Sequence, residues 1–217
     1  NVVSRYATYD IPFGNIDRPC YENNSFDEAR FEVPAHMWMD MSQADFGVSL
    51  LNNCKYGHEA HENMIGLTLL RSPKDPDPES DMEVHTFIYS IYPHGGDWRD
   101  ADVYAEALDL NDPLDAVRTD THTGDRPATA AFMTVTPGNT TLEALKQSEA
   151  GADWILRVVE RHGSQSSVQI ALPEKCSRVT DCTLMEEEIT EIKTENGTLD
   201  VPIHPYEIKT FKLEFSS

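Results

Sequence analysis

The sequence predicts an all-β protein built as an antiparallel β-sandwich, with a smaller second β-sandwich portion at its C-terminal end. Short runs rich in β-branched and aromatic residues alternate along the chain with turns rich in Gly, Pro, Asn and Asp, which is the pattern of strands and their connections. In the last run, 208–215, Phe211 and Leu213 alternate with polar residues. One apolar and one polar face are typical of a sheet that packs on a second layer.

The expected strands follow this alternation in chain order. A single helix is expected over 97–110, with Asp100 as its N-cap and three apolar residues at helical spacing. Run 184–192 contains three consecutive Glu residues, but the threonines near its ends favour a strand. The strands are expected at 29–33, 46–52, 65–70, 85–92, 129–135, 141–146, 154–161, 168–172, 184–192 and 208–215.

Two polar segments divide the chain. Residues 71–82 hold three prolines and three aspartates, which favours an extended, exposed connection because proline fixes φ and removes a donor. Residues 111–127 are similarly polar. We therefore expect a main β-sandwich portion over 1–127 and a C-terminal β portion over 128–217 that completes the sandwich or packs on it.

The charge of the chain restricts its partners. The 217 residues include 38 acidic and 17 basic side chains, a formal net charge of −21. Nucleic acids and anionic membranes would be repelled, so we expect neither as a partner. No apolar run approaches the ~20 residues of a membrane span. The chain begins without Met and without an apolar leader, and we expect it to be part of a longer protein.

Four cysteines occur, at positions 20, 54, 176 and 182. Their spacing fits no zinc knuckle and no CxxC motif. Free thiols in a reducing compartment are the favoured interpretation, and a disulfide between Cys176 and Cys182 is the alternative.

The motif search favours no catalytic or metal centre. His58 and His61 flank Glu59 and Ala60, a spacing that would suit a metal on a helix, but Gly57 and the strand-rich context predict a solvated turn. The acidic loop 75–81 lacks the central Gly and the terminal Glu of a calcium loop. No nucleophile elbow, P-loop or dinucleotide fingerprint is present. We expect no catalytic residue and no metal ligand in this chain.

One turn does carry groups that suit sugar hydroxyls. Asn53 can donate and accept, Lys55 donates, and Tyr56 combines an apolar ring with a hydroxyl; Arg71, further along, is another donor. The simpler interpretation is that this turn only closes a hairpin, with Gly57 supplying a positive φ. Asn53, Lys55, Tyr56 and Arg71 are our candidates for contact with a substrate.

The chain resembles the C-terminal β-domain of glycoside hydrolase family 38 α-mannosidases, in particular the cytosolic and bacterial branch. The resemblance spans nearly the whole chain and rests on long, ordered motifs. They are IPFGNIDRP at 11–19, FEVPAH at 31–36, DFGV at 45–48, LNNCKYG at 51–57, LLRSP at 69–73, the strand ending in YPHG at 92–95, LDLNDPL at 108–114, ILRVVE at 155–160, LMEE at 184–187 and HPYEIKT at 204–210.

This resemblance implies a fold and a function. The fold is a galactose-mutarotase-like supersandwich, and the parent protein is a retaining α-mannosidase whose N-terminal barrel holds zinc through His and Asp side chains, including a His-x-Asp motif. None of the eight histidines here is followed two residues later by Asp. We therefore expect no zinc in this chain, which alone should be inactive and should support the catalytic domain of the same polypeptide in the cytoplasm.

Two other functions remain open at this point. The turn at 52–57 and the nearby Trp38 would suit a stand-alone carbohydrate-binding β-sandwich module acting on mannose-containing oligosaccharides. An independent sandwich enzyme of the mutarotase type would use His and Glu in a cleft, although fold analogy is a weak guide to function. The linkage specificity and any homo-oligomer stay undetermined by the sequence.

Overall fold

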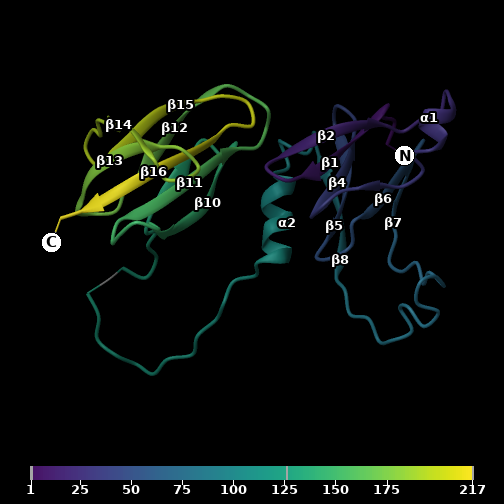
Figure 1. Ribbon diagram of the computed structural model, residues 1–217, viewed down its shortest axis with the longest axis horizontal. Helices are drawn as coiled ribbons and strands as arrows, with labels where there is room; N and C mark the ends of the chain where they lie inside the picture. The colour runs from purple at the N-terminus through teal and green to yellow at the C-terminus, as the bar shows by residue number, and fades with distance from the viewer. Residues whose placement is uncertain (1, 126, 217) are drawn as a thin grey trace. The chain divides into compact units, whose positions relative to one another are not determined.

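The computed structural model describes residues 2–125 and 127–216, and the chain divides into two compact units (Figure 1). The N-terminal unit is Asn1–Val117 and the C-terminal unit is Arg118–Ser217. The division predicted at 127/128 falls, like this one, in the connection between helix α2 (Val103–Asn111) and strand β9 (Thr134–Thr136).

A five-stranded antiparallel sheet forms the centre of the N-terminal unit. Residue pairs such as Tyr9 with Met39 and Leu50 with Ile91 set its register. Because β8 pairs only with β5 among the described residues, it is an edge strand. In spatial order the strands are β2 (Gly14–Pro19), β1 (Tyr6–Ile11), β4 (Trp38–Ser42), β5 (Phe46–Asn52) and β8 (Tyr89–Gly95).

A second, smaller sheet covers one face of this central sheet. It contains β3 (Val33–Pro34), β6 (Gly57–His61) and β7 (Met64–Leu67). Between the two sheets lies a core of buried side chains that includes Tyr9, Met39, Met41 and Leu50. Because successive side chains of a strand point to opposite faces, the pleat of β1, β4 and β5 directs these residues toward the small sheet and their neighbours to the other face.

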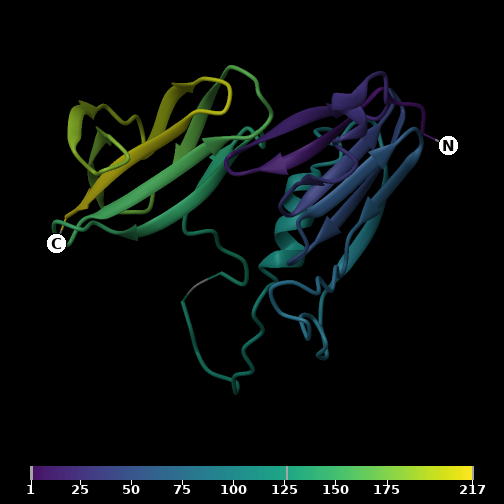
Figure 2. The same cartoon turned by 45° about the vertical axis from the view of Figure 1, so that its right-hand side comes forward.

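Helix α2 lies against the opposite face of the central sheet (Figures 1 and 2). Val103 and Ala107 are fully buried there against Trp38, Leu51 and Trp98. The two cores account for the near-continuous burial along β4, whose side chains meet the small sheet on one face and α2 on the other.

The C-terminal unit is a sandwich of a five-stranded and a three-stranded antiparallel sheet. Its core joins residues of both sheets, among them Leu156, Ile170, Leu199 and Phe211, each 0% exposed. In spatial order the first sheet is β10 (Thr140–Gln147), β11 (Trp154–Glu160), β16 (Ile208–Phe215), β13 (Cys176–Cys182) and β14 (Glu188–Ile192), and the second is β15 (Thr198–Ile203), β12 (Ser166–Ala171) and β9.

The predicted fold class, an all-β antiparallel sandwich with a second β portion, is confirmed. The strand predicted over 29–33 is wrong. The side chain of Asn24 accepts hydrogen bonds from two backbone N–H groups and starts a short helix, α1 (Ser25–Glu28), so that only β3 pairs in this region. A local capping interaction outweighs the strand propensity here.

Several predicted boundaries are also wrong. The strand predicted over 85–92 is β8, which starts at Tyr89, and Tyr89 and Ile91 on this strand are exposed. In the run predicted over 129–135 the only strand is β9, which begins at Thr134. In the run predicted over 184–192 the only strand is β14, which begins at Glu188. Helix α2 has Asp102 at its N-cap, whereas Asp100 belongs to a turn organised by Asp97. None of the helices in the described residues has the length and apolarity to cross a membrane.

Candidate functional site

The candidate turn is organised by Asn52, the last residue of β5. Its side chain is buried and its Oδ1 accepts hydrogen bonds from the backbone N–H groups of Cys54 (3.1 Å) and Lys55 (2.6 Å). Its Nδ2 donates to the carbonyl oxygen of His36 (2.9 Å). An asparagine that satisfies its own turn in this way fixes the backbone of the following residues, so Asn52 positions the candidates without contacting solvent.

Asn53 and Lys55 lie against the segment that leads into β8. The backbone of Asn53 donates to the carbonyl of Ile88 (3.1 Å), and its Oδ1 accepts from the N–H of Ile88 (2.9 Å). The ammonium group of Lys55 lies 4.9 Å from the ring centroid of Phe87, a cation–π arrangement. The exposed Asn53 still offers its Nδ2 donors to a ligand.

Tyr56 belongs to the same turn, and Arg71 reaches the turn through Glu32. Tyr56 is 59% exposed and its ring lies 5.4 Å from that of His36. Arg71 donates to Oε2 of Glu32 (3.1 Å), whose carboxylate lies against Gly57. Three of the four candidates therefore belong to the turn 53–57 and Arg71 is joined to it through Glu32; together they present a hydroxyl, an amide and two cations.

Trp38, considered above as a ring for sugar stacking, is unsuited to that role. It is 1% exposed, and its ring lies 5.1 Å from Trp98 in the core beneath α2. A side chain without exposed surface cannot present a face to a sugar, so Trp38 is a core residue.

The residues around His58 do not form a metal site. The segment forms strand β6 instead of the expected loop. Successive strand residues point to opposite faces, so His58 is buried while His61 is exposed. Burial lowers the pKa of His58. In the part of the chain that the structure describes, no group of three or more His, Cys, Asp or Glu side chains is placed to hold a metal ion. These residues do not fit the zinc site of family 38, and we assign no step to zinc here.

A buried Asp–Ser–His cluster in the central sheet was not anticipated from the sequence. Oδ2 of Asp40 accepts from Oγ of Ser49 (2.7 Å) and lies 2.8 Å from Nε2 of His94. Nε2 of His94 also lies 3.2 Å from the Ser49 Oγ. In a catalytic triad the aspartate holds the imidazole nitrogen that faces away from the serine. Here both groups meet one imidazole nitrogen inside the fold, so the cluster is structural.

The same cluster explains one glycine. A Cβ at Gly47 would stand within van der Waals overlap of the His94 ring and of Ser42 Oγ. His94 is buried and cannot move aside. The glycine of the DFGV motif therefore gives the imidazole its space, a requirement that becomes visible only when β5 and β8 are paired.

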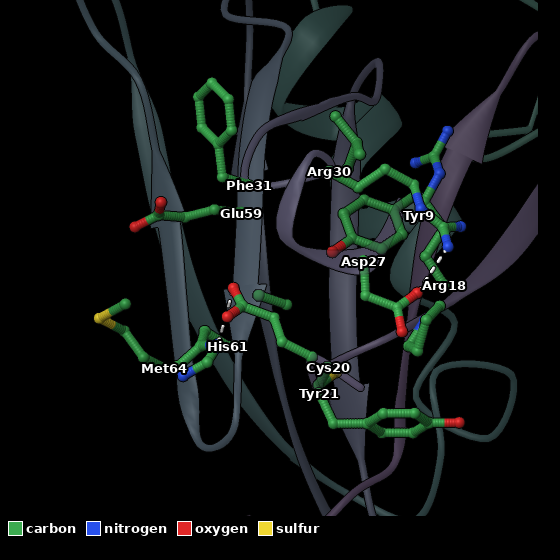
Figure 3. A pocket seen from close by; sticks show the side chains of 14 residues that line it. Tyr9, Arg18, Cys20, Tyr21, Asp27, Arg30, Phe31, Glu59, His61 and Met64 are labelled. Carbon is green, nitrogen blue, oxygen red and sulfur yellow. Dashed lines mark hydrogen bonds and ion pairs between the residues drawn. The ribbon is translucent and has the colours of Figure 1, made fainter. Parts of the chain in front are cut away.

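A pocket lies on the other face of the central sheet, between β1, β2, α1 and the small sheet (Figure 3). It has a volume of about 300 Å³, and its lining includes Tyr9, Tyr21, Arg30 and His61. Burial raises the pKa of the Cys20 thiol, which also lines the pocket, to about 11, so this thiol stays protonated near neutral pH. None of the four substrate-contact candidates lines it, and its residues come from five separate segments.

All four cysteines are free thiols. Cys176 and Cys182 lie at the two ends of the seven-residue strand β13. At about 3.3 Å per strand residue they are far beyond the ~7 Å that a disulfide can span. The alternative of a Cys176–Cys182 disulfide is therefore wrong.

Two family models match this chain. Residues 1–79 match the model described as "Glycosyl hydrolases family 38 C-terminal domain". Residues 139–211 match that described as "Glycosyl hydrolases family 38 C-terminal beta sandwich domain". The first match lies in the N-terminal unit and the second in the C-terminal unit.

Longer proteins resemble the chain over almost its whole length. "Alpha-mannosidase G" of Dictyostelium discoideum is 37% identical over 220 residues, which cover 96% of this chain and 20% of the relative. "Alpha-mannosidase 2C1" of Mus musculus is 37% identical over 99% of this chain and 21% of the relative. The chain thus spans about a fifth of the length of these relatives.

The fold is found in a solved structure. The crystal structure of an alpha-mannosidase from Enterococcus faecalis V583 superposes with a TM-score of 0.79 over 98% of this chain and 24% of that one, at 20% identity. At that identity the likeness concerns the fold. The two family models and the near-complete alignments show that this chain belongs to glycosyl hydrolase family 38, whose C-terminal domains its two units match.

Proposed function

We propose that this chain is the C-terminal β-region of a retaining α-mannosidase and that it supports a catalytic domain located N-terminally in the same polypeptide. The observation that carries the proposal is the 37% identity over nearly the whole chain to much longer proteins that are named alpha-mannosidases. By the family resemblance, the zinc ion and the two carboxylates of hydrolysis belong to that catalytic domain. The same resemblance favours a cytoplasmic location.

An apolar edge next to the candidate turn supports the idea of a docked catalytic domain. Ile88, Tyr89 and Ile91 are 56%, 51% and 64% exposed, along and just before the edge strand β8. A contiguous apolar patch on a protein surface often marks an interface. Asn53 is hydrogen-bonded to Ile88. A domain seated on this edge would therefore lie beside Asn53, Lys55 and Tyr56, close enough for these side chains to reach its substrate.

The proposal is tested by assaying an aryl α-mannoside with the 217-residue chain and with the longer protein that contains it. We expect the longer protein to turn over and the chain alone to stay at the buffer rate, with or without added zinc. An inactive longer protein would contradict the mannosidase assignment. Turnover by the chain alone would contradict the assignment of catalysis to another domain.

The role of the turn calls for a separate measurement. In the longer protein, Lys55→Ala is expected to raise KM about 3- to 10-fold and to change kcat little, because a donor to a sugar hydroxyl is worth about 0.5–1.5 kcal/mol and contributes to binding before the chemical step. Lys74→Ala, in the exposed loop 71–82, is the matched control and should leave KM unchanged. Equal effects of the two substitutions would exclude a contact by Lys55.

A stand-alone carbohydrate-binding module is the second candidate function. The exposed Tyr56 beside the free donors of Asn53 favours it. Calorimetry with mannobiose separates the two: heat of binding that is lost on Tyr56→Ala supports a module built on this turn, whereas no heat, or heat that Tyr56→Ala leaves unchanged, supports a packing domain.

A further inference from the structure

The pocket between β1, β2, α1 and the small sheet has the features of a small-molecule site. Its volume of about 300 Å³ is at the lower end of the range for ligand sites. It lies wholly within the N-terminal unit, and it is distinct from the turn at 53–57. Apolar rings and charged groups both line it, so a ligand there would meet two kinds of contact.

Tyr9 supplies a buried polar group to this pocket. Its side chain is 2% exposed, and its hydroxyl points into the pocket (Figure 3). Among the described residues, the fully buried polar atoms without a partner do not include this hydroxyl, which faces the open space of the pocket. Burial also raises the pKa of Tyr9, so the group keeps its proton and can donate to an oxygen of a ligand.

The charged residues of the pocket select against an anion. Two guanidinium groups, those of Arg18 and Arg30, meet three carboxylates, those of Glu22, Asp27 and Glu59. Both guanidinium groups already have partners within the protein. Arg30 pairs with Asp27 at 2.7 Å, and Arg18 donates to the carbonyl of Pro34 at 3.0 Å. The remaining carboxylate oxygens can only accept hydrogen bonds, so a ligand must bring O–H or N–H donors.

Aromatic side chains complete the site at its rim. Phe31 is 62% exposed and Tyr21 37% exposed, and both line the pocket. Exposed rings of this size offer apolar area to the C–H face of a ring-shaped ligand. The ligand chemistry is thus a neutral ring that carries several hydroxyl groups, since such groups both donate and accept.

We propose that this pocket binds a neutral monosaccharide unit, with the Tyr9 hydroxyl donating to a sugar oxygen, the pocket carboxylates accepting from sugar hydroxyls, and Phe31 or Tyr21 covering an apolar face of the ring. The inference goes beyond the proposed function, because it needs neither a catalytic domain nor turnover. A failed mannosidase assay would not contradict sugar binding in this pocket, and a failed binding test would not contradict the mannosidase assignment.

The test is a titration of the isotopically labelled 217-residue chain with methyl α-mannoside, in which NMR monitors the amide chemical shifts. We expect millimolar binding and shifts at the pocket residues, including Cys20, Phe31 and His61. Tyr9→Phe should weaken binding about 3- to 10-fold, as expected for the loss of one hydrogen bond. Tyr89→Phe, which removes the same hydroxyl from an exposed position outside the pocket, should leave it unchanged.

Three results would overturn the proposal. The first is the absence of shifts at the pocket residues of the wild-type chain, a readout that does not depend on how the variant folds. The second is equal affinity of Tyr9→Phe and wild type in a variant whose spectrum is otherwise native. The third is binding of mannose 6-phosphate or of glycerol as tight as that of the mannoside, because the net negative pocket and its aromatic rim should disfavour both.

Discussion

Trp38→Ala is expected to lower the free energy of unfolding of the N-terminal unit by about 3–5 kcal/mol, the range for removing a large aromatic side chain from a packed core. Trp38 is the largest of the fully buried side chains. It stands between the central sheet and α2, where it contacts Trp98 and packs with Val103 and Ala107. Alanine would leave a cavity beside Trp98, Val103 and Ala107, and the cost depends on how far this site can collapse.

Hydrogen exchange under increasing denaturant measures this loss unit by unit, which matters because two units need not unfold together. Amides of β5 should lose protection, whereas amides of β11 in the C-terminal unit should keep theirs. Trp154→Ala is the matched control. Trp154 is 39% exposed, so its removal should cost clearly less and act on the other unit. A loss below about 1 kcal/mol at Trp38 would mean that the helix does not depend on this contact.

The sequence predicted the fold class but few of the exact strand limits. Runs with clear alternation, such as 46–52 and 208–215, coincide with β5 and β16. Two of the strands that were missed lack apolar alternation. Strand β2 reads GNIDRP and β13 reads CSRVTDC, and both are held in place by antiparallel neighbours. Pairing with a neighbour decides such strands, and it involves residues far apart in the chain.

The candidate site, like the fold, was predictable only where it depends on residues close together in the sequence. The local motif LNNCKYG identified the turn, because Asn and Gly determine turn geometry within a few residues. Its neighbour Ile88 and the Arg71–Glu32 ion pair were not predictable, since they depend on how distant segments meet. The pocket at Tyr9 was missed for the same reason. Its lining residues come from five separate segments of the chain, and only folding brings them together.

Glu160→Gln is expected to lower the free energy of unfolding of the C-terminal unit by about 2–4 kcal/mol at neutral pH. Glu160 ends β11 and is 0% exposed. Its two oxygens accept five hydrogen bonds. The donors are the backbone N–H groups of His162 (2.9 Å), Gly163 (2.9 Å) and Tyr206 (3.0 Å), the side-chain amide of Asn139 (3.1 Å) and the hydroxyl of Ser164 (3.1 Å).

These bonds explain the expected size of the effect. Hydrogen bonds to a charged acceptor are worth about 1.5–3 kcal/mol each, and a buried donor left without a partner costs about 1–3 kcal/mol. A glutamine would replace one carboxylate oxygen by an N–H₂ group that faces donors. The turn after β11, the turn before β16 and the start of β10 all depend on this one side chain. Glu174→Gln, at an exposed position of the same unit, is the control and should be neutral.

The effect of Glu160→Gln should also depend on pH. Burial acts to raise the pKa of Glu160, but the backbone N–H donors of Tyr206, His162 and Ser164 outweigh it and hold the pKa below its ordinary value. A carboxylate with a depressed pKa in the folded state stabilises the protein above the unfolded pKa of about 4.3. That contribution is lost as the pH falls through the lower pKa of the folded state.

The stability difference between wild type and Glu160→Gln should therefore be largest near neutral pH and shrink on acidification below about pH 4. Denaturant titrations of both proteins across this pH range measure the difference. If it stays constant or grows in acid, the carboxylate charge is not what holds the two turns and the start of β10 in place.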